Sequence, residues 1–307
     1  MAVPSSGAVS LAGIRAELAT NTYDANATTQ ASLLECSDGT VSTINTGNNA
    51  SDRPDGSTPH EMSEFYSYDH DLSTFADSKS FDFDGTNDYL HFQSGNIGTD
   101  IEATGSISVW VKLDSMSANG FIWQIKEEEG TDNQIILLWN NAAGVIRGNV
   151  KFGGTTNVVD SGSGLENDGN WHHVVFTWES GSKTSANNIV RLYIDGSETD
   201  NDAIGNTWGS ETGHAGFIIG RNDIQSNAYF NGHMNDIAFF NDVLTSSEVS
   251  AIYNSGSPKE EESHSGIIAY YTMEGYTDGD TTLVDDSGNS KTLQINNSTN
   301  IDSTDTP

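Results

Sequence analysis

A pair of apolar runs on either side of a carboxylate-rich turn, residues 81–92, constrains the fold of this chain most. Phe81 and Phe83 alternate with aspartates, and this period of two marks a strand with one buried face. The turn from Asp84 to Asp88 contains residues that favour tight turns, and a second apolar run follows it. The stretch therefore predicts two neighbouring strands.

The same pattern of short strands and turns continues through most of the chain. Trp171 to Trp178 alternates cleanly, Asp195-Gly196 is a hairpin signal, and 31 glycines punctuate the runs. One helix is expected, where Thr245 and Glu248 have the spacing of a capping box. We predict a mainly β fold, an antiparallel jelly-roll β-sandwich, with strands in residues 107–113, 120–126, 134–140, 145–152, 171–178, 190–194, 217–220, 234–240, 267–271 and 293–295.

Residues 1–78 have a different composition, with three small apolar patches separated by polar stretches. A short helix is expected from Leu11, with Ser10 as its N-cap, and a second patch runs from Ala31 to Leu34. Thr58 and Glu61 have capping-box spacing before a third patch. These patches are too small for a sizeable core. We therefore predict an extended, short-helical anchor that becomes ordered against a partner or against the following domain.

The charge of the chain excludes several functions. Lys and Arg number 12 against 44 Asp and Glu, which gives a formal charge of -32. Such a field repels nucleic acid and anionic membranes, and it fits either a solvated acidic surface or calcium sites. Cys36 is the only cysteine, so neither an intrachain disulfide nor a cysteine-based zinc site is expected. No apolar run suits a signal peptide or a bilayer span, so synthesis in the cytoplasm without membrane insertion is expected.

Several motifs, in their order along the chain, resemble the laminin-G-like, concanavalin A-like lectin/glucanase family. The resemblance covers about residues 80–297 and implies a concanavalin A-like sandwich. The motifs are Phe83-Asp84-Gly85-Thr86-Asn87-Asp88-Tyr89-Leu90, Ile107 to Lys112, Trp171-His172-His173-Val174, Leu192-Tyr193-Ile194-Asp195-Gly196, Ile219-Gly220-Arg221, the strand from Phe230 to Phe240, and Leu244 to Val249.

One departure from the family pattern concerns the order of the segments. Family members often begin with a strand and a D-x-S-G-N turn that precede the F-D-G turn, whereas here Ile268 to Gly275 and Asp286 to Asn289 come late. A truncated second copy would explain this, but only one F-D-G turn is present. We therefore predict a circularly permuted sandwich whose residues 266–297 lie beside the Phe81 strand and close the sheet.

The N-terminal region resembles the opening segments of bacteriophage tail and virion proteins. The matching residues are Gly7 to Leu18, which contain I-R-x-E-L, and Met62-Ser63-Glu64-Phe65-Tyr66. The glycine that usually follows the final tyrosine is Ser67 here. The resemblance implies a virion structural protein whose residues 1–78 contact other virion proteins.

Catalysis is not expected, although the fold family includes glucanases. Retaining glycosidases need two carboxylates about 5 Å apart, and members of this fold carry them in a Glu-x-Asp-x-(x)-Glu run that is absent here. Glu127 to Glu129 is consecutive and reads as a solvated turn. His172 and His173 are neighbours on a strand, so their side chains point to opposite faces and cannot chelate one ion together.

Calcium is the expected cofactor, if there is one. Asp84, Asn87 and Asp88 offer hard oxygen ligands in one turn, although turn residues can equally serve only as hydrogen-bond acceptors. Asp286 and Asn289 lie in the segment expected to dock alongside. The family resemblance adds Asp236, at a position where members carry an acidic residue, and implies a structural calcium in some members.

Three aromatic residues in turn-like stretches are candidates for stacking on a sugar ring: Trp139, Trp208 and Tyr229. They could equally serve a contact between subunits.

Together these observations predict a bacteriophage virion protein with three parts: an anchor at residues 1–78, a lectin-like sandwich at 79–297 and a flexible tail at 298–307. The sandwich would act in adhesion to host surface glycans or in decoration of tail or capsid, as a homo-oligomer in the particle. The alternatives are a purely structural protein without a ligand and a glycan-degrading enzyme of the same fold.

Overall fold

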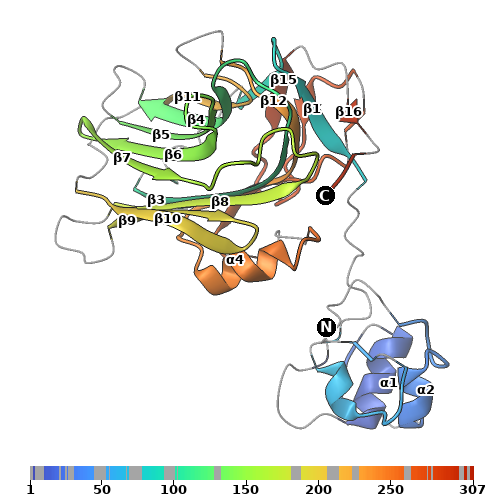
Figure 1. The fold of residues 1–307 in the computed structure, drawn as a ribbon. Helices are drawn as coiled ribbons and strands as arrows, with labels where there is room; N and C mark the ends of the chain where they lie inside the picture. Colours follow the sequence, from blue (N-terminus) through green and yellow to red (C-terminus); the bar gives the residue numbers. More distant parts are fainter. Residues whose placement is uncertain are drawn as a thin grey trace. The chain divides into compact units, whose positions relative to one another are not determined.

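The computed structural model divides the chain into two compact units, Met1–Ala76 and Asp77–Pro307. The division lies close to the boundary predicted after residue 78. Figure 1 shows the elements of both units. The structure describes residues 3, 10–20, 22–24, 26, 31–44, 53–54, 56–66, 68, 78–92, 101, 103–127, 133–180, 188–205, 214–222, 228–258, 264–274, 276–277, 279–296, 301–302 and 305–307.

The N-terminal unit has a small core of its own, which differs from the predicted extended anchor. Its helices are α1 (Leu11–Thr20), α2 (Leu33–Ser37) and the 3-10 helix η1 (Met62–Phe65). As expected, the Ser10 hydroxyl accepts a hydrogen bond from Gly13 N, at 3.0 Å, whereas the cap expected at Thr58 is formed by Glu61. The buried core residues come from distant parts of the segment: Val3, Ile14, Leu18, Cys36, Phe65 and Tyr68.

The second unit is an antiparallel sandwich of two sheets, as the sequence predicts (Figure 1). Sheet A has the order β10-β9-β8-β3-β12-β1-β16, with β13 also paired to β12. Sheet B has the order β14-β15-β2-β11-β4-β5-β6-β7. The strands are β1 (Ser80–Asp84), β2 (Tyr89–Phe92), β3 (Thr104–Leu113), β4 (Gly120–Glu127), β5 (Gln134–Asn140), β6 (Val145–Phe152), β7 (Thr155–Asp160), β8 (His172–Glu179), β9 (Ile189–Ile194), β10 (Ser197–Ala203), β11 (His214–Ile219), β12 (Asn231–Phe240), β13 (Ile267–Tyr271), β14 (Thr282–Leu283), β15 (Leu293–Asn296) and β16 (Ile301–Asp302).

Alternating side chains of the two sheets meet in one aromatic-rich core. Trp123 of sheet B stacks on Trp178 of sheet A, with ring centroids 5.6 Å apart. Helix α4 (Ser246–Tyr253) packs on the outer side of sheet A, where Tyr253 stacks on Trp110. The capping box predicted for α4 at Thr245 is confirmed. Burial of large aromatic side chains stabilises this arrangement, because apolar surface leaves water.

The late strands join both sheets, but not in the predicted way. Strand β13 pairs with β12, Tyr270 opposite Ala238, rather than with the Phe81 strand. Strand β1 pairs with the other half of β12, with Phe81 opposite Met234. Strands β1 and β13 therefore follow one another along the same side of β12, opposite β3. The circular permutation stays a prediction, because pairing within one chain does not compare its order with that of relatives.

Two shorter strands also come from the last part of the chain. Strand β15 pairs with β2, Ile295 opposite Leu90. Strand β16 lies within residues 298–307, which were predicted to be a flexible tail, and it pairs with β1 through Ile301 and Asp302. The described part of that segment is therefore attached to the sandwich.

Candidate ligand-binding site at the edge of the sandwich

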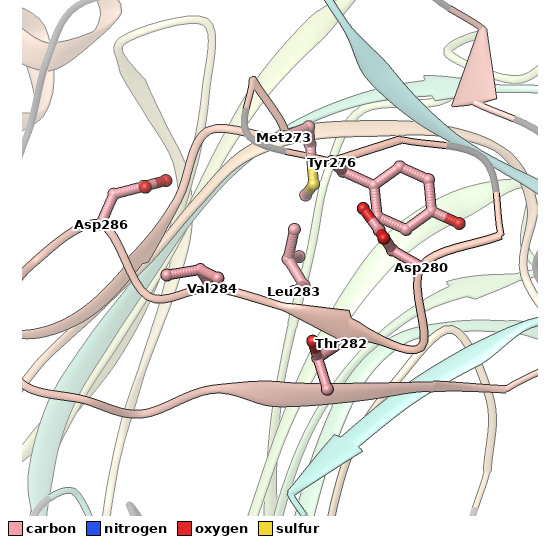
Figure 2. A pocket seen from close by; sticks show the side chains of 7 residues that line it. All are labelled: Met273, Tyr276, Asp280, Thr282, Leu283, Val284 and Asp286. Carbon is pink, nitrogen blue, oxygen red and sulfur yellow. The ribbon is translucent and has the colours of Figure 1, made fainter.

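A cavity of about 220 Å³ lies where the chain passes from β13 in sheet A to β14 in sheet B. Its floor is apolar and buried, and consists of Met273, Tyr276 and Leu283. Figure 2 shows Leu283 pointing toward Met273, and Thr282 pointing the opposite way. Of the remaining lining residues, Asp280, Val284 and Asp286 are exposed and Thr282 is half-buried.

Backbone hydrogen bonds hold the two carboxylates at the rim. Asp280 accepts from Thr277 N at 2.9 Å. Asp286 accepts from the backbone N–H and the hydroxyl of Thr272, both at 2.9 Å. A carboxylate offers about four acceptor positions, so each has further capacity for a donor in a ligand.

The buried neighbour Asp285 holds this turn in place. Its carboxylate accepts hydrogen bonds from Tyr270 N, Ser287 N and Lys291 N. Only 6% of Asp285 is exposed, and its bonds tie the segment after β14 to β13. Sequence reasoning named Asp286, as a calcium ligand, and overlooked Asp285; the available signal was the Asp-Asp pair at the start of the turn motif.

The cavity combines an apolar floor with two carboxylate acceptors at its rim. This combination suits a small ligand that has a C–H face and several hydroxyl or cationic donors. Anionic ligands are disfavoured, because like charges repel.

The residues predicted to bind calcium do not form one site. Asp84 accepts from Thr86 N at 2.7 Å and Asn87 N at 3.1 Å, and buried Asp88 accepts from Asp84 N at 3.1 Å. Asp84 lies opposite Asn231 of β12. The Asp286 turn adjoins Tyr270, opposite Ala238 of β12, so seven residues (238 − 231), roughly 20 Å of strand, separate the two turns.

The other predicted calcium ligands serve the fold. Asp236 is buried and accepts from the Tyr270 hydroxyl at 3.2 Å. The Asn289 amide donates to Ile267 O, at 3.2 Å. Within the described ranges, no three His, Cys, Asp or Glu side chains gather in a way that could hold a metal ion. Calcium binding stays a prediction without a site in that part of the chain.

The three aromatic residues predicted to stack on sugar have different outcomes. Trp139 is 1% exposed and lies in the core, so this prediction is wrong. It fails because Trp139 alternates with Leu138 and shares the inward face of β5 with Leu137. Trp208 lies outside the described residues. Tyr229 is half-buried and does not line the cavity.

Sequence reasoning missed a polar patch on sheet B around Tyr89 and His91 of β2. The Arg221 guanidinium lies 3.8 Å from the centre of the Tyr89 ring, a cation–π contact. The Asn296 amide lies 2.9 Å from His91 Nδ1. Burial and the Arg221 charge lower the pKa of His91, which favours its neutral form. The signal in the sequence was the alternation of these two rings with core residue Leu90.

The paired histidines have separate structural partners. His173 is fully buried, lies 2.8 Å from the Ser108 hydroxyl, and has its pKa lowered to about 3 by burial. His172 lies between Asp195 at 2.9 Å and Asp168 at 3.1 Å. The hydrogen bond with Asp195, opposed by burial and supported by Asp168, raises the pKa of His172.

Comparison with known proteins identifies the fold. A family model described as the concanavalin A-like lectin/glucanases superfamily matches residues 84–250, more than half of the chain. No significant match is found among curated proteins. In the described part of the chain, no helix has the length and apolar character needed to cross a membrane.

Solved structures share the fold at low sequence identity. A Bacteroides ovatus protein described as a candidate carbohydrate-binding protein is 18% identical, with a TM-score of 0.54, and the match covers 76% of this chain and 62% of that protein. This chain thus spans less than two thirds of that protein's length. A heptameric SAP-like pentraxin from Limulus polyphemus is 16% identical, with a TM-score of 0.46 and coverage of 71% and 94%. The Ruminococcus gnavus sialidase domain CBM40, bound to α2,3 sialyllactose, is 15% identical, with a TM-score of 0.45 and coverage of 57% and 96%.

Proposed function

The chain belongs to the concanavalin A-like lectin/glucanase superfamily, and we propose that its β-sandwich is a carbohydrate-binding module. The observation that supports this most is the cavity beside β14, with its apolar floor and its rim of Asp280 and Asp286 (Figure 2). Sugar rings present aliphatic C–H groups on their faces and hydroxyl donors at their edges, so they complement such a cavity.

The charge of the chain narrows the class of sugar. With a formal charge of -32 and two carboxylates at the rim, the site favours neutral or amino sugars over uronates and sialates. A cavity of about 220 Å³ suits one sugar residue at the end or on a branch of a glycan.

Glycan arrays of neutral, amino and acidic sugars test this proposal directly. Val284 is 61% exposed at the cavity, and Val284→Asp replaces apolar contact with charge. Loss of the contact between Val284 and a bound sugar should lower affinity at least about 10-fold. The matched control is Val158→Asp on β7, at the far end of sheet B, where the wild-type valine is 37% exposed. Equal sugar binding by both variants would show that the sugar does not bind in this cavity.

Two alternatives give different results in the same experiments. A glycan-degrading enzyme would release reducing ends from polysaccharides, and Asp280→Asn or Asp286→Asn would stop the release. A purely structural sandwich would be silent on arrays, would leave polysaccharides intact and would form a large contact between subunits.

We further propose that the N-terminal unit attaches the sandwich to a bacteriophage tail or capsid, where copies assemble as a homo-oligomer. The support is the resemblance of Gly7 to Leu18 and of Met62 to Tyr66 to virion proteins, together with the division of the chain into two compact units. Electron microscopy of intact particles would place Met1–Ala76 against other virion proteins and the sandwich outside. Purified particles that lack the protein would contradict the proposal.

A further inference from the structure

The outer face of sheet A surrounds one carboxylate, that of Asp305, with three donor side chains. Lys112 Nζ forms an ion pair with it at 2.5 Å, and Trp171 Nε1 donates to it at 2.9 Å. His233 Nε2 lies 3.8 Å from the same group. Lys112 of β3 and His233 of β12 are opposite one another in the sheet. We call Lys112, Trp171 and His233 the carboxylate cradle.

A second contact attaches the same segment, residues 301–307, to the neighbouring strand. Ile301 and Asp302 pair with Phe81 and Ser80, at the edge of sheet A. The Ser80 hydroxyl also donates to Asp305 O at 2.6 Å. The segment thus makes backbone pairing at one point and a charged contact at another.

The cradle has the chemistry of a carboxylate receptor. An ammonium group and an indole N–H can only donate, so they match an acceptor with two oxygens. Burial opposes ionisation of Asp305, but hydrogen bonds from Lys112 and Trp171 and the nearby positive charges lower its pKa overall. Cations are scarce in this chain, 12 against 44 acidic residues, so few other places on it attract an acidic segment.

Both contacts are weak enough to open. The Lys112 and Asp305 side chains are 21% and 25% exposed, and partly exposed ion pairs add little net stability. Among the described residues of the segment, two pair with β1, Ile301 and Asp302. When the segment leaves, the β1 edge offers unpaired backbone groups, which readily accept another extended chain.

We propose that the carboxylate cradle and the β1 edge form a docking site for an extended acidic segment, and that residues 301–307 of a second copy of this chain can replace the chain's own. The exchange links copies of the sandwich by a contact that is independent of the sugar cavity.

Two full-length variants that complement each other test this proposal. In Lys112→Gln the cradle loses its cation but the acidic segment is intact, so this chain acts as the donor. In Asp305→Ala the cradle is intact but its own carboxylate is gone, so this chain acts as the acceptor. Fluorescence anisotropy of labelled donor should show association with the acceptor. Wild-type chain should bind the donor at least about 10-fold more weakly, because a tethered segment competes at an effective concentration near millimolar.

Controls distinguish binding at the carboxylate cradle from non-specific association. The double variant Lys112→Gln/Asp305→Ala should not bind the donor. The variant Lys151→Gln/Asp305→Ala, changed on β6 in the other sheet, should bind like the acceptor. Circular dichroism of every variant should match the wild type. Binding should weaken as salt is raised, because the contact is charged.

Two results would overturn the proposal. Equal donor binding by the acceptor and by the double variant would show that the cradle is not the receptor. No binding of donor, or of a synthetic peptide of residues 298–307, at about millimolar concentration would show that the segment is only an intrachain clamp.

Discussion

Asp88 lies at the end of the turn between β1 and β2, where the folded structure disfavours its ionisation. It is 6% exposed, and burial raises its pKa to about 6, against the lowering effect of the Asp84 N–H; the charges of Asp84 and Asp82 raise it further. The unfolded chain has a pKa near 3.9. The folded state therefore holds the proton more tightly, and stability is lost as pH rises from about 4 to above 6.

Asp88→Asn should accordingly stabilise the sandwich at neutral pH. The amide oxygen keeps an acceptor for Asp84 N, and no charge is buried, so we expect a gain on the order of 1–3 kcal/mol at pH 7.5. At pH 4 the gain should vanish, because wild-type Asp88 is then protonated. Urea unfolding at both pH values measures this. A gain that is the same at both would show that the charge of Asp88 is not the cause.

His172 gives a second pH dependence, this time through a basic side chain. Its folded pKa is raised above about 6.5 by Asp195 and Asp168. The stabilisation is therefore fully present below about pH 6.5 and is lost as pH rises through the folded pKa. His172→Gln should cost up to about 1 kcal/mol at pH 6, since both carboxylates are partly exposed, and less at pH 9. A cost that does not change over this range in urea unfolding would contradict the ion-pair role.

Among the strands, β6 has a glycine that sets how closely the two sheets approach. An added Cβ at Gly148 would collide with the ring of Phe176 in β8 of the opposite sheet. Gly148→Ala should therefore destabilise the sandwich by about 1–3 kcal/mol. Gly162→Ala is the matched control, because no atom lies within 4 Å of an added Cβ there. The two urea midpoints should differ clearly, and similar midpoints would mean that the sheets adjust freely.

Periodicity predicted the strands that have a buried face, and it missed those that do not. Residues 134–140, 145–152 and 267–271 are strands with the predicted bounds. The polar strand β10 and the largely polar β7 gave no apolar alternation, so only the Asp195-Gly196 turn pointed to β10. The pairing partner of a strand could not be predicted either. The pattern of Ile267–Tyr271 predicts a strand, but not the strand with which it pairs.

The site was only partly predictable for a related reason. Acidic turn residues were recognised, but their meeting depends on the register along β12, which places Asp84 and Tyr270 far apart. The apolar floor of the cavity comes from Met273, Tyr276 and Leu283, which carry no pattern distinguishable from ordinary core residues. Trp139 was misassigned because the polar residues Asn140, which ends its strand, and Asn141, which follows it, are neighbours in sequence only, whereas the Trp139 side chain lies in the core.

On the scale of the whole molecule, two units of different size share one chain. The N-terminal unit buries six apolar side chains in its described core, whereas the sandwich has a much larger one. Small cores give marginal stability. The small core could not be predicted from the sequence, because it joins residues that are far apart in the chain. Val3 N, for example, donates a hydrogen bond to Tyr68 O, and no local pattern indicates this contact.

The division into two units also divides the natural reporter groups of the protein. The only cysteine, Cys36, belongs to the N-terminal unit, and all six tryptophans belong to the sandwich. Burial raises the pKa of the Cys36 thiol to about 11, so a thiol reagent reacts only when the small unit opens. In a urea series, labelling of Cys36 should therefore begin below the tryptophan fluorescence transition, whereas coincident transitions would mean that the units unfold together. The protein thus needs no introduced probe: its own thiol reports on the N-terminal unit, and its own tryptophans report on the sandwich.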